Sequence, residues 1–253
     1  MRIMFHKPSS TAKEICQEQK AQIAPPTNDF QKKAVEIKDA ILSQGFVIIE
    51  DPGVGKRVAD FRRKQYPFQG KDGLYFLQDT LDDKRTVDLV ESLWERSGLG
   101  MFKVRGPHAH CARAPLNKTT DEILLVNAIH CNPGTTIVLY ENSFNLCLDA
   151  RPPPHDDLDT GLLEISSKTI AEIPGITVTT RTLPDGGLIL SDGRFFSTVL
   201  QGFAIEVGFA DEKEIKKWRN KMPYPDFPWL RELVTRMERE KIKINIEFFA
   251  VKT

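Results

Sequence analysis

The stretch GLILSDGRFFSTVLQGFAIEVGF, residues 187–209, holds three short runs rich in Ile, Val, Leu and Phe that are separated by turn-forming residues. Runs of this kind are typical of β-strands. Four similar runs precede them, at residues 122–130, 135–140, 161–166 and 175–183. Seven short strands at this spacing, without ten-residue helical patterns between them, predict an antiparallel sandwich or barrel.

Helical patterns flank this β-rich part on both sides. Before it we expect a strand at 46–49 between helices at 30–44 and 54–64, and then a helix from Thr80 to Gly98, with Asp83 completing a capping box. After it we expect a helix at 211–222 and a second one that Asp226 caps, with Pro228 just inside. Residues 242–250 alternate apolar and polar side chains, which predicts an internal strand of the main sheet.

The composition is that of an ordinary globular protein, with 40% hydrophobic and 28% charged residues. The 35 basic and 35 acidic side chains balance, which argues against a general nucleic-acid binder. No run approaches the ~18–20 apolar residues of a membrane-spanning helix. We expect residues 1–28 to be loosely ordered and residues 29–253 to form one domain of a cytoplasmic protein, whose four cysteines stay reduced.

Two short motifs have simple structural interpretations. The segment DPGVGKR, residues 51–57, follows a strand and opens a helix, but Glu50 and Arg57 stand where a phosphate-binding loop needs Gly and Ser or Thr. It therefore predicts a tight turn. A nucleophilic Cys–His pair built from Cys111 or Cys131 stays open, since sequence says nothing about activation of either thiol.

Among the five histidines, His108 and His110 form the only close pair. On a strand both side chains would leave the same face. They would then form half of a metal site, or a polar pair that lines a pocket and exchanges protons. His130, ahead of a turn, is expected to be structural, and His155, in a proline-rich loop, to be exposed.

Four segments carry a resemblance to a known family: ILSQGFVII at 41–49, HAH at 108–110, PGTTIVLYENS at 133–143 and DGGLILSDGR at 185–194. Together they resemble the iron(II)/2-oxoglutarate-dependent dioxygenases, particularly the phytanoyl-CoA-hydroxylase-like branch, over roughly residues 30–209. The resemblance implies an α+β fold with a mainly β core. This is a double-stranded β-helix, or jelly-roll barrel, with flanking N-terminal helices, two C-terminal helices and the active site inside the barrel mouth.

The chain departs from the chemistry that this family needs. The family's iron site uses a His-x-Asp/Glu pair and a later His, and a basic residue on the following strand binds 2-oxoglutarate. Here His108 matches the first ligand, but His110 stands in place of the acid and Ser197 falls where the later His is expected. No His follows His155, and residues 195–211 contain no Lys or Arg.

Three functions remain open at this point. The first is a metal-independent isomerase, cyclase or lyase of specialised metabolism that needs no cofactor and acts on a small molecule. In it His108 or His110 moves a proton and Arg194 polarises a carbonyl, while Asn127, Tyr140 and Ser197 position the substrate. The second is an Fe(II) oxygenase, hence an oxidoreductase, with His108 and His110 as ligands. The third is a non-catalytic binding protein. Neither nucleic acid nor membrane is an expected partner.

Overall fold

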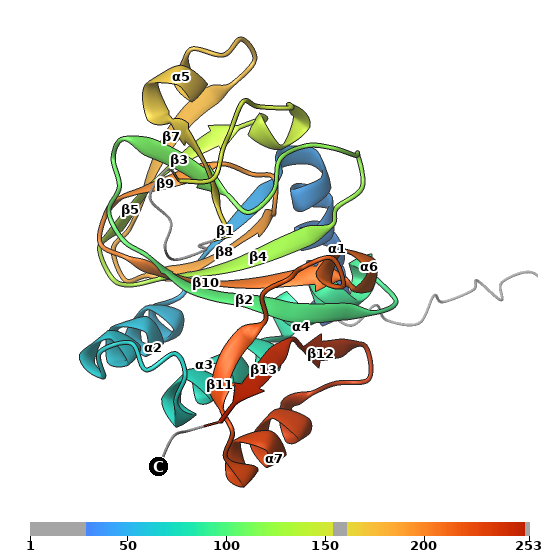
Figure 1. Cartoon of the computed structure of the whole chain (residues 1–253). Coiled ribbons are helices and arrows are strands. Elements are labelled where there is room, and N and C mark those ends of the chain that lie inside the picture. The colour runs from blue at the N-terminus through green and yellow to red at the C-terminus, as the bar shows by residue number, and fades with distance from the viewer. Residues whose placement is uncertain (1–28, 154–160, 251–253) are drawn as a thin grey trace, which may run out of the picture.

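A computed structural model describes residues 29–153 and 161–250 of the chain, and the segment 1–28 lies outside these ranges. Two facing β-sheets form the core, and most of the helices cover the outer face of the larger sheet (Figure 1). No helix in the described ranges is long and apolar enough to cross a membrane.

The larger sheet has six strands. Their order is β1 (Phe46–Glu50), β8 (Gly187–Asp192), β4 (Leu125–Cys131), β10 (Ala204–Asp211), β2 (Ser97–Arg105) and β12 (Ile242–Ile244). All neighbours are antiparallel except β2 and β12, which run parallel. Every residue of β4 and β8 is buried, so both faces of the sheet centre are covered.

The smaller sheet has five strands. Their order is β6 (Leu163–Ser166), β3 (Cys111–Ala114), β9 (Ser197–Gln201), β5 (Thr135–Glu141) and β7 (Thr177–Leu183). From β2 to β5, and again from β7 to β10, each successive strand lies in the other sheet. This alternation winds the two sheets together as a double-stranded β-helix, the jelly-roll architecture that the sequence predicted.

Alternate residues of the central strands face two different cores. Ala128, Leu190 and Val207 point away from the barrel and pack with the helices in one large apolar cluster. Ile129 and Ile189 point into the barrel and pack with side chains of the smaller sheet. This parity decides which polar side chains share the barrel interior.

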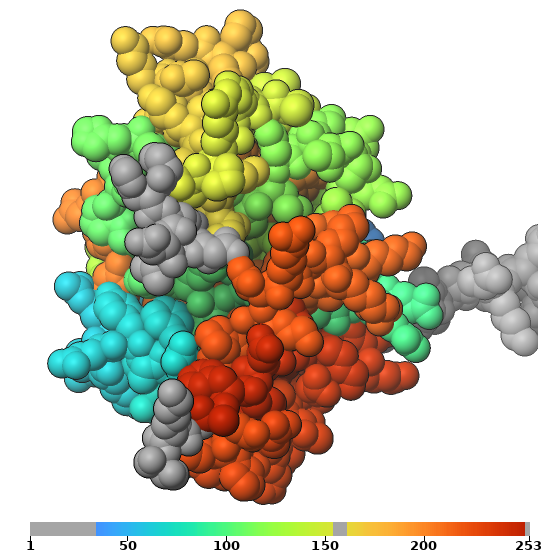
Figure 2. All heavy atoms as spheres, viewed as in Figure 1, coloured from blue at the N-terminus to red at the C-terminus, as the bar shows by residue number. Residues whose placement is uncertain are grey.

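The helices are short except at the N-terminus. They are α1 (Asp29–Gln44), α2 (Pro52–Arg63), α3 (Lys71–Asp82), α4 (Lys84–Leu93), α5 (Ser167–Ala171), α6 (Glu212–Ile215) and α7 (Pro228–Met237), with a 3-10 turn at Ser143–Asn145. The C-terminal segment, red in Figure 2, lies against the cyan region, where α7 contacts α3. The apolar cluster outside the barrel thus joins helices from both ends of the described chain.

All seven strands predicted from the β-rich runs are present, together with the strand at 46–49 and the first two helices. The helix predicted to begin at Thr80 is wrong. Thr80 lies inside α3, whereas Asp83 is extended, with φ −73° and ψ 105°, and caps α4 by accepting a hydrogen bond from Arg85 N. Two helices therefore replace one, because Asp83 ends α3 and starts α4. The sequence patterns did not predict β2, β3, α3 or α5.

The C-terminal predictions need three corrections. The helix at 211–222 is only the four-residue α6, and Pro223 and Pro225 lie in a strand, β11 (Met222–Pro225), where they cannot extend a helix. Asp226 does not cap α7, which begins after Phe227; its carboxylate binds Arg231 instead.

The predicted strand at 242–250 is divided at Asn245. Its first part, β12, lies at the edge of the larger sheet, and its second part, β13 (Ile246–Phe249), pairs with β11. The backbone N–H of Asn245 donates to the carbonyl of Leu99 on β2, and its own carbonyl accepts from the backbone N–H of Met222 on β11. Asn245 therefore connects the larger sheet with the two-stranded sheet of β11 and β13. The prediction of an internal strand is therefore wrong: β12 is the last strand of the larger sheet, and β13 lies in a separate two-stranded sheet. Alternation predicts a strand but does not show which strands pair with it.

Candidate functional site

Five polar side chains gather inside the barrel: Arg105, Asn127, Ser191, Ser197 and Glu206, which we call the interior cluster. All five are buried. Strand register places Asn127 on β4 directly opposite Ser191 on β8 and Gly208 on β10, and Glu206 is the next inward residue of β10. Because Gly208 has no side chain, Met101 of β2 packs over it beside Asn127; a Cβ on Gly208 would lie 2.9 Å from Cε of Met101.

Arg105 connects the cluster across the two sheets. Its Nη1 donates to Ser197 Oγ at 3.1 Å, and its Nη2 donates to the Ser197 carbonyl at 2.8 Å. Its Nη1 also lies 3.7 Å from Oε1 of Glu206, which is completely buried. Arg105 and Glu206 therefore form a buried ion pair inside the barrel. Two further basic side chains lie on the same inward faces: Lys103 is opposite Glu206 on β2, and Arg113, which pairs with Glu164, is opposite Ser197 on β3.

Four polar atoms of the interior cluster have no hydrogen-bond partner among the described residues. They are Asn127 Oδ1, Ser191 Oγ and both carboxylate oxygens of Glu206. Buried polar atoms in native proteins are nearly always bonded to protein, water or a ligand. The cluster thus holds acceptors and a hydroxyl that the described residues leave without a hydrogen bond.

The structure brings only two of the predicted site residues into this cluster, Asn127 and Ser197. Tyr140 points to the other face of the smaller sheet, where it packs with Ala112 and Phe196. Arg194 lies in the turn between β8 and β9 and is fully engaged: it donates to both oxygens of Asp192 and to the carbonyl of Thr120. It therefore orders that turn and does not face the interior cluster.

The predicted strand placement of His108 and His110 is wrong, since both lie in the connection between β2 and β3. His110 is exposed and His108 is half-buried. The backbone N–H of His108 donates to Val199 on β9, and its buried Nδ1 has no partner among the described residues. The two imidazoles consequently do not share one face of a strand. His155 lies outside the described residues.

The family resemblance implies iron(II) and 2-oxoglutarate, and the interior cluster fits neither. Arg105 places a positive charge against Ser197, where the later iron ligand is expected, and would repel a metal cation. Glu206 places a negative charge on the strand where the resemblance expects a cation for 2-oxoglutarate. Residues 29–153 and 161–250 contain no group of three His, Cys, Asp or Glu side chains arranged to hold a metal ion.

Neither cysteine of the possible Cys–His pair has an activated thiol. Burial raises the pKa of Cys131 to about 12. Burial, followed by the nearby Glu164 carboxylate, also raises the pKa of Cys111. Since the thiolate is the nucleophile, both residues are poor nucleophiles near neutral pH.

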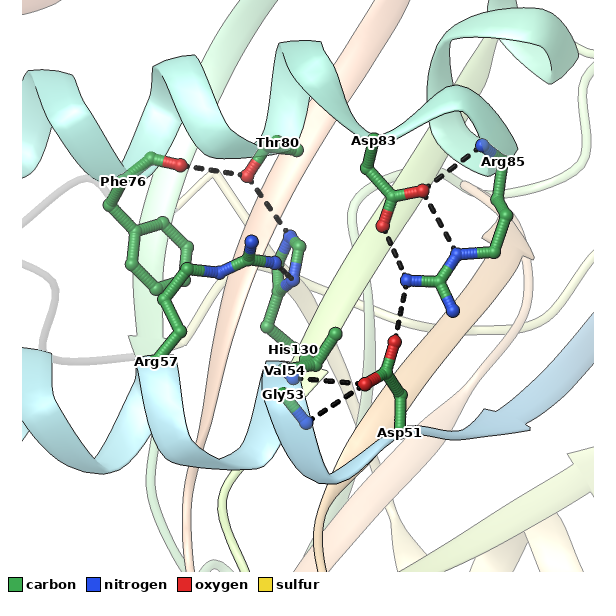
Figure 3. A network of polar contacts seen from close by, with 9 residues as sticks. All are labelled: Asp51, Gly53, Val54, Arg57, Phe76, Thr80, Asp83, Arg85 and His130. Carbon is green, nitrogen blue, oxygen red and sulfur yellow. Dashed lines mark hydrogen bonds and ion pairs between the residues drawn. The ribbon is translucent and has the colours of Figure 1, made fainter.

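Outside the barrel, a second polar arrangement lies between α2 and α3 (Figure 3). His130 leaves β4 toward the helices; its Nδ1 lies 3.2 Å from Nη2 of Arg57 and its Nε2 lies 3.2 Å from Oγ1 of Thr80. The Thr80 hydroxyl in turn lies 3.0 Å from the carbonyl of Phe76. Because arginine only donates, Nδ1 of His130 accepts, and Nε2 carries the ring proton toward Thr80.

His130 is a neutral, structural histidine, as its position before a turn predicted. Complete burial lowers its pKa well below the usual 6.5, and the charges of Arg57 and Arg85 lower it further. Burial also lowers the pKa of Arg57. The imidazole thus fixes the orientation of Arg57 without carrying a charge.

The tight turn predicted at residues 51–57 is shorter than expected, because α2 already begins at Pro52 and only Asp51 separates it from β1. Asp51 accepts hydrogen bonds from the backbone N–H groups of Gly53 and Val54 and thereby caps α2. Its other carboxylate oxygen lies 2.8 Å from Nη2 of Arg85. The start of α2 is therefore already occupied by an acidic side chain, which leaves no free helix terminus for a phosphate (Figure 3).

No protein-family model and no curated protein matches the chain. Among solved structures, the chain is similar to the epimerase SnoN in complex with Fe3+, alpha ketoglutarate and nogalamycin RO. The two share 11% identity over 71% of this chain and 84% of SnoN, with a TM-score of 0.47. HygX from Streptomyces hygroscopicus with iron bound shares 14% identity over 70% of this chain and 86% of HygX, with a TM-score of 0.46.

EctD from S. alaskensis, solved with 2-oxoglutarate and 5-hydroxyectoine, shares 10% identity over 84% of this chain and 86% of EctD, with a TM-score of 0.48. These three TM-scores all lie below 0.5. The double-stranded β-helix is therefore assigned from the strand order of the chain itself.

Proposed function

We propose that the protein is a small-molecule enzyme that transfers protons inside the barrel without a metal, as an isomerase, cyclase or lyase. The observation that supports it most is the pairing of Arg105 with Ser197 and Glu206, at the positions where the related chemistry would need an iron ligand and a basic residue. A barrel that keeps buried, unpartnered polar atoms around this pair is suited to bind and hold a polar group of a substrate.

Each member of the interior cluster has a role in this proposal. The Glu206 carboxylate accepts a proton from a substrate carbon and returns it at a second position, so that no oxidant or reductant is needed. Arg105 stabilises the negative charge that develops on a neighbouring carbonyl oxygen, and Asn127 Oδ1 accepts a hydrogen bond from a substrate hydroxyl. The Ser191 hydroxyl lies opposite Asn127 and orients the same end of the substrate.

The walls beside the cluster indicate an amphipathic substrate. Ile129 and Ile189 are inward neighbours of Asn127 and Ser191 on the same two strands, and Val199 faces them from β9. A molecule with one polar end and an apolar body would place its polar end against Asn127 and Ser191 and its body against the apolar side chains. In this proposal His108 lies beside the middle of β9, where its backbone N–H donates to Val199, and has no assigned role; His110, Arg194 and Tyr140 take no part in the chemistry.

The test is an unbiased product profile. Wild-type protein and the Glu206→Gln variant are each incubated with a mixture of candidate metabolites, with a chelator or with added iron and 2-oxoglutarate, and products are read by mass spectrometry. Glu50→Gln is the matched control, because Glu50 is an exposed carboxylate at the end of β1. We expect isomers, cyclised products or elimination products with wild type and Glu50→Gln in chelator, and none with Glu206→Gln.

Two results would contradict the proposal. Products that form only with iron and 2-oxoglutarate would assign an oxygenase, with His108 and His110 as the ligands to examine. Retention of a metabolite by the protein without any product would assign a binding protein. Equal melting temperatures of Glu206→Gln and wild type show that lost turnover is not lost folding.

A further inference from the structure

A cleft of about 600 Å³ lies outside the barrel, between α2 and α3. Its floor includes the aromatic rings of Phe61 and Phe76, and its polar wall includes Arg57 and Asp79. The cleft lies on the outer face of the larger sheet, since His130 beneath Arg57 leaves β4 on the side opposite to Asn127. It is therefore separate from the interior cluster.

Most of the charges around this cleft are neutralised by neighbours. Arg85 binds Asp51 at 2.8 Å and Asp83 at 2.6 Å, and Lys64 binds Asp72. The guanidinium of Arg57 has no carboxylate within ion-pair distance among the described residues. Its only hydrogen bond goes to His130, and its buried Nε–H has no acceptor in the described part of the chain. Asp79 attracts Arg57 only from beyond ion-pair distance. The positive charge of the partly buried guanidinium is therefore incompletely balanced, and an anion bound directly to it in the cleft would relieve part of the cost of its burial.

Arg57 is also held in place before any ligand arrives. His130 accepts a hydrogen bond from Nη2, and the guanidinium carbon lies 5.5 Å from the centre of the Phe76 ring. Thr80 fixes the imidazole from its other side (Figure 3). A donor group fixed by its surroundings loses little conformational entropy on binding, which favours affinity.

We propose that this cleft binds a small organic monocarboxylate, with its carboxylate on Arg57 and its apolar body against Phe61 and Phe76. The planar fork of a guanidinium matches the two oxygens of a carboxylate. Asp79 on the same wall, and the carboxylate of Asp51 at the start of α2, make the cleft unfavourable for a polyanion such as a nucleotide phosphate.

The proposal is tested by titrating the full chain with benzoate, with a set of aliphatic and aromatic monocarboxylates, and with inorganic phosphate, using ligand-observed NMR and calorimetry. We expect benzoate to bind more tightly than phosphate. Arg57→Gln should weaken benzoate binding by at least about tenfold, because the guanidinium supplies the charge-assisted hydrogen bonds. Arg236→Gln is the control, since Arg236 is an exposed arginine on α7 that does not line the cleft, and it should bind as wild type does.

Two further variants keep the test decisive if Arg57→Gln folds poorly. Arg57→Lys retains the charge without the fork and should bind benzoate more weakly than wild type. Asp79→Asn removes a repelling carboxylate and should bind it more tightly. The proposal would be overturned if Arg57→Lys bound benzoate as tightly as wild type and Asp79→Asn bound it more weakly. It would also be overturned if wild type bound no carboxylate of the set.

Discussion

Arg105 on β2 joins the two sheets of the barrel by donating two hydrogen bonds to Ser197, the first residue of β9. The same guanidinium lies 3.7 Å from the buried carboxylate of Glu206. The pair is thus at once a bridge between the sheets and the charged centre of the interior cluster.

The first prediction concerns the energetics of this pair. Arg105→Met removes the ion-pair partner of the completely buried Glu206, and we expect the free energy of unfolding to fall by about 3–5 kcal/mol. The double variant Arg105→Met, Glu206→Leu should recover much of that loss, since it removes both charges. Urea denaturation of the wild type, the two single variants Arg105→Met and Glu206→Leu, and the double variant measures the coupling. Additive losses in the double variant would mean that the two groups do not depend on each other.

The second prediction concerns pH. The pKa of His130 is low in the folded protein and near 6.5 in the unfolded chain, so between these values the unfolded chain binds more protons. His130 therefore lowers stability as the pH falls below about 6.5, by up to about 1.4 kcal/mol per pH unit, and has no such effect above it. His130→Gln should show a flatter dependence than wild type in urea denaturation from pH 7.5 to 5. Parallel curves for the two proteins would show that His130 takes up a proton in the fold.

The third prediction concerns the two parts of the C-terminal strand pair. Ile242 on β12 is completely buried, whereas Phe249 on β13 is 41% exposed. We expect Ile242→Ala to cost about 2–4 kcal/mol, because it leaves a cavity in the apolar cluster, and Phe249→Ala to cost clearly less. Thermal and urea unfolding of both variants makes the comparison. A larger loss of unfolding free energy for Phe249→Ala than for Ile242→Ala would contradict this and would show that β13 stabilises the fold more than β12.

The sequence predicted the fold well where local pattern and tertiary pairing agree. The runs around Ile129, Ile189 and Val207 are apolar on both faces, as expected of strands between two cores, and all became strands. Asp83 and Asn245 were misread for a common reason. Neither residue interrupts the sequence pattern around it. The extended backbone of Asp83 separates α3 from α4, and a change of pairing partner at Asn245 separates β12 from β13.

The site was predicted less well, because side-chain direction depends on elements that the sequence does not show. His108 and His110 look like a strand pair until β2 is seen to end at Arg105. Tyr140 is one residue away from the inward-facing Leu139, and that difference moves it to the other face of the sheet. Glu206 carried a signal that was available: an acidic residue inside an apolar strand is almost never buried unless it is paired.

Arg57 illustrates a different limit. The segment 51–57 lacks the residues of a phosphate loop, and in the structure Asp51 caps the helix that follows it. The arginine at its end becomes notable only when α3 and His130 close around it, from positions far along the chain. A charge without a counter-ion is a property of the packed structure and has no local sequence pattern.

The most direct test of a metal-free barrel is calorimetric titration of 2-oxoglutarate into the wild-type protein with iron(II), without oxygen. We predict no binding below about 1 mM, because a carboxylate inside the barrel would meet Glu206 rather than a free cation and would lose its hydration without compensation. A dissociation constant in the micromolar range that disappears in His108→Ala would contradict this account and would assign the barrel to an iron oxygenase.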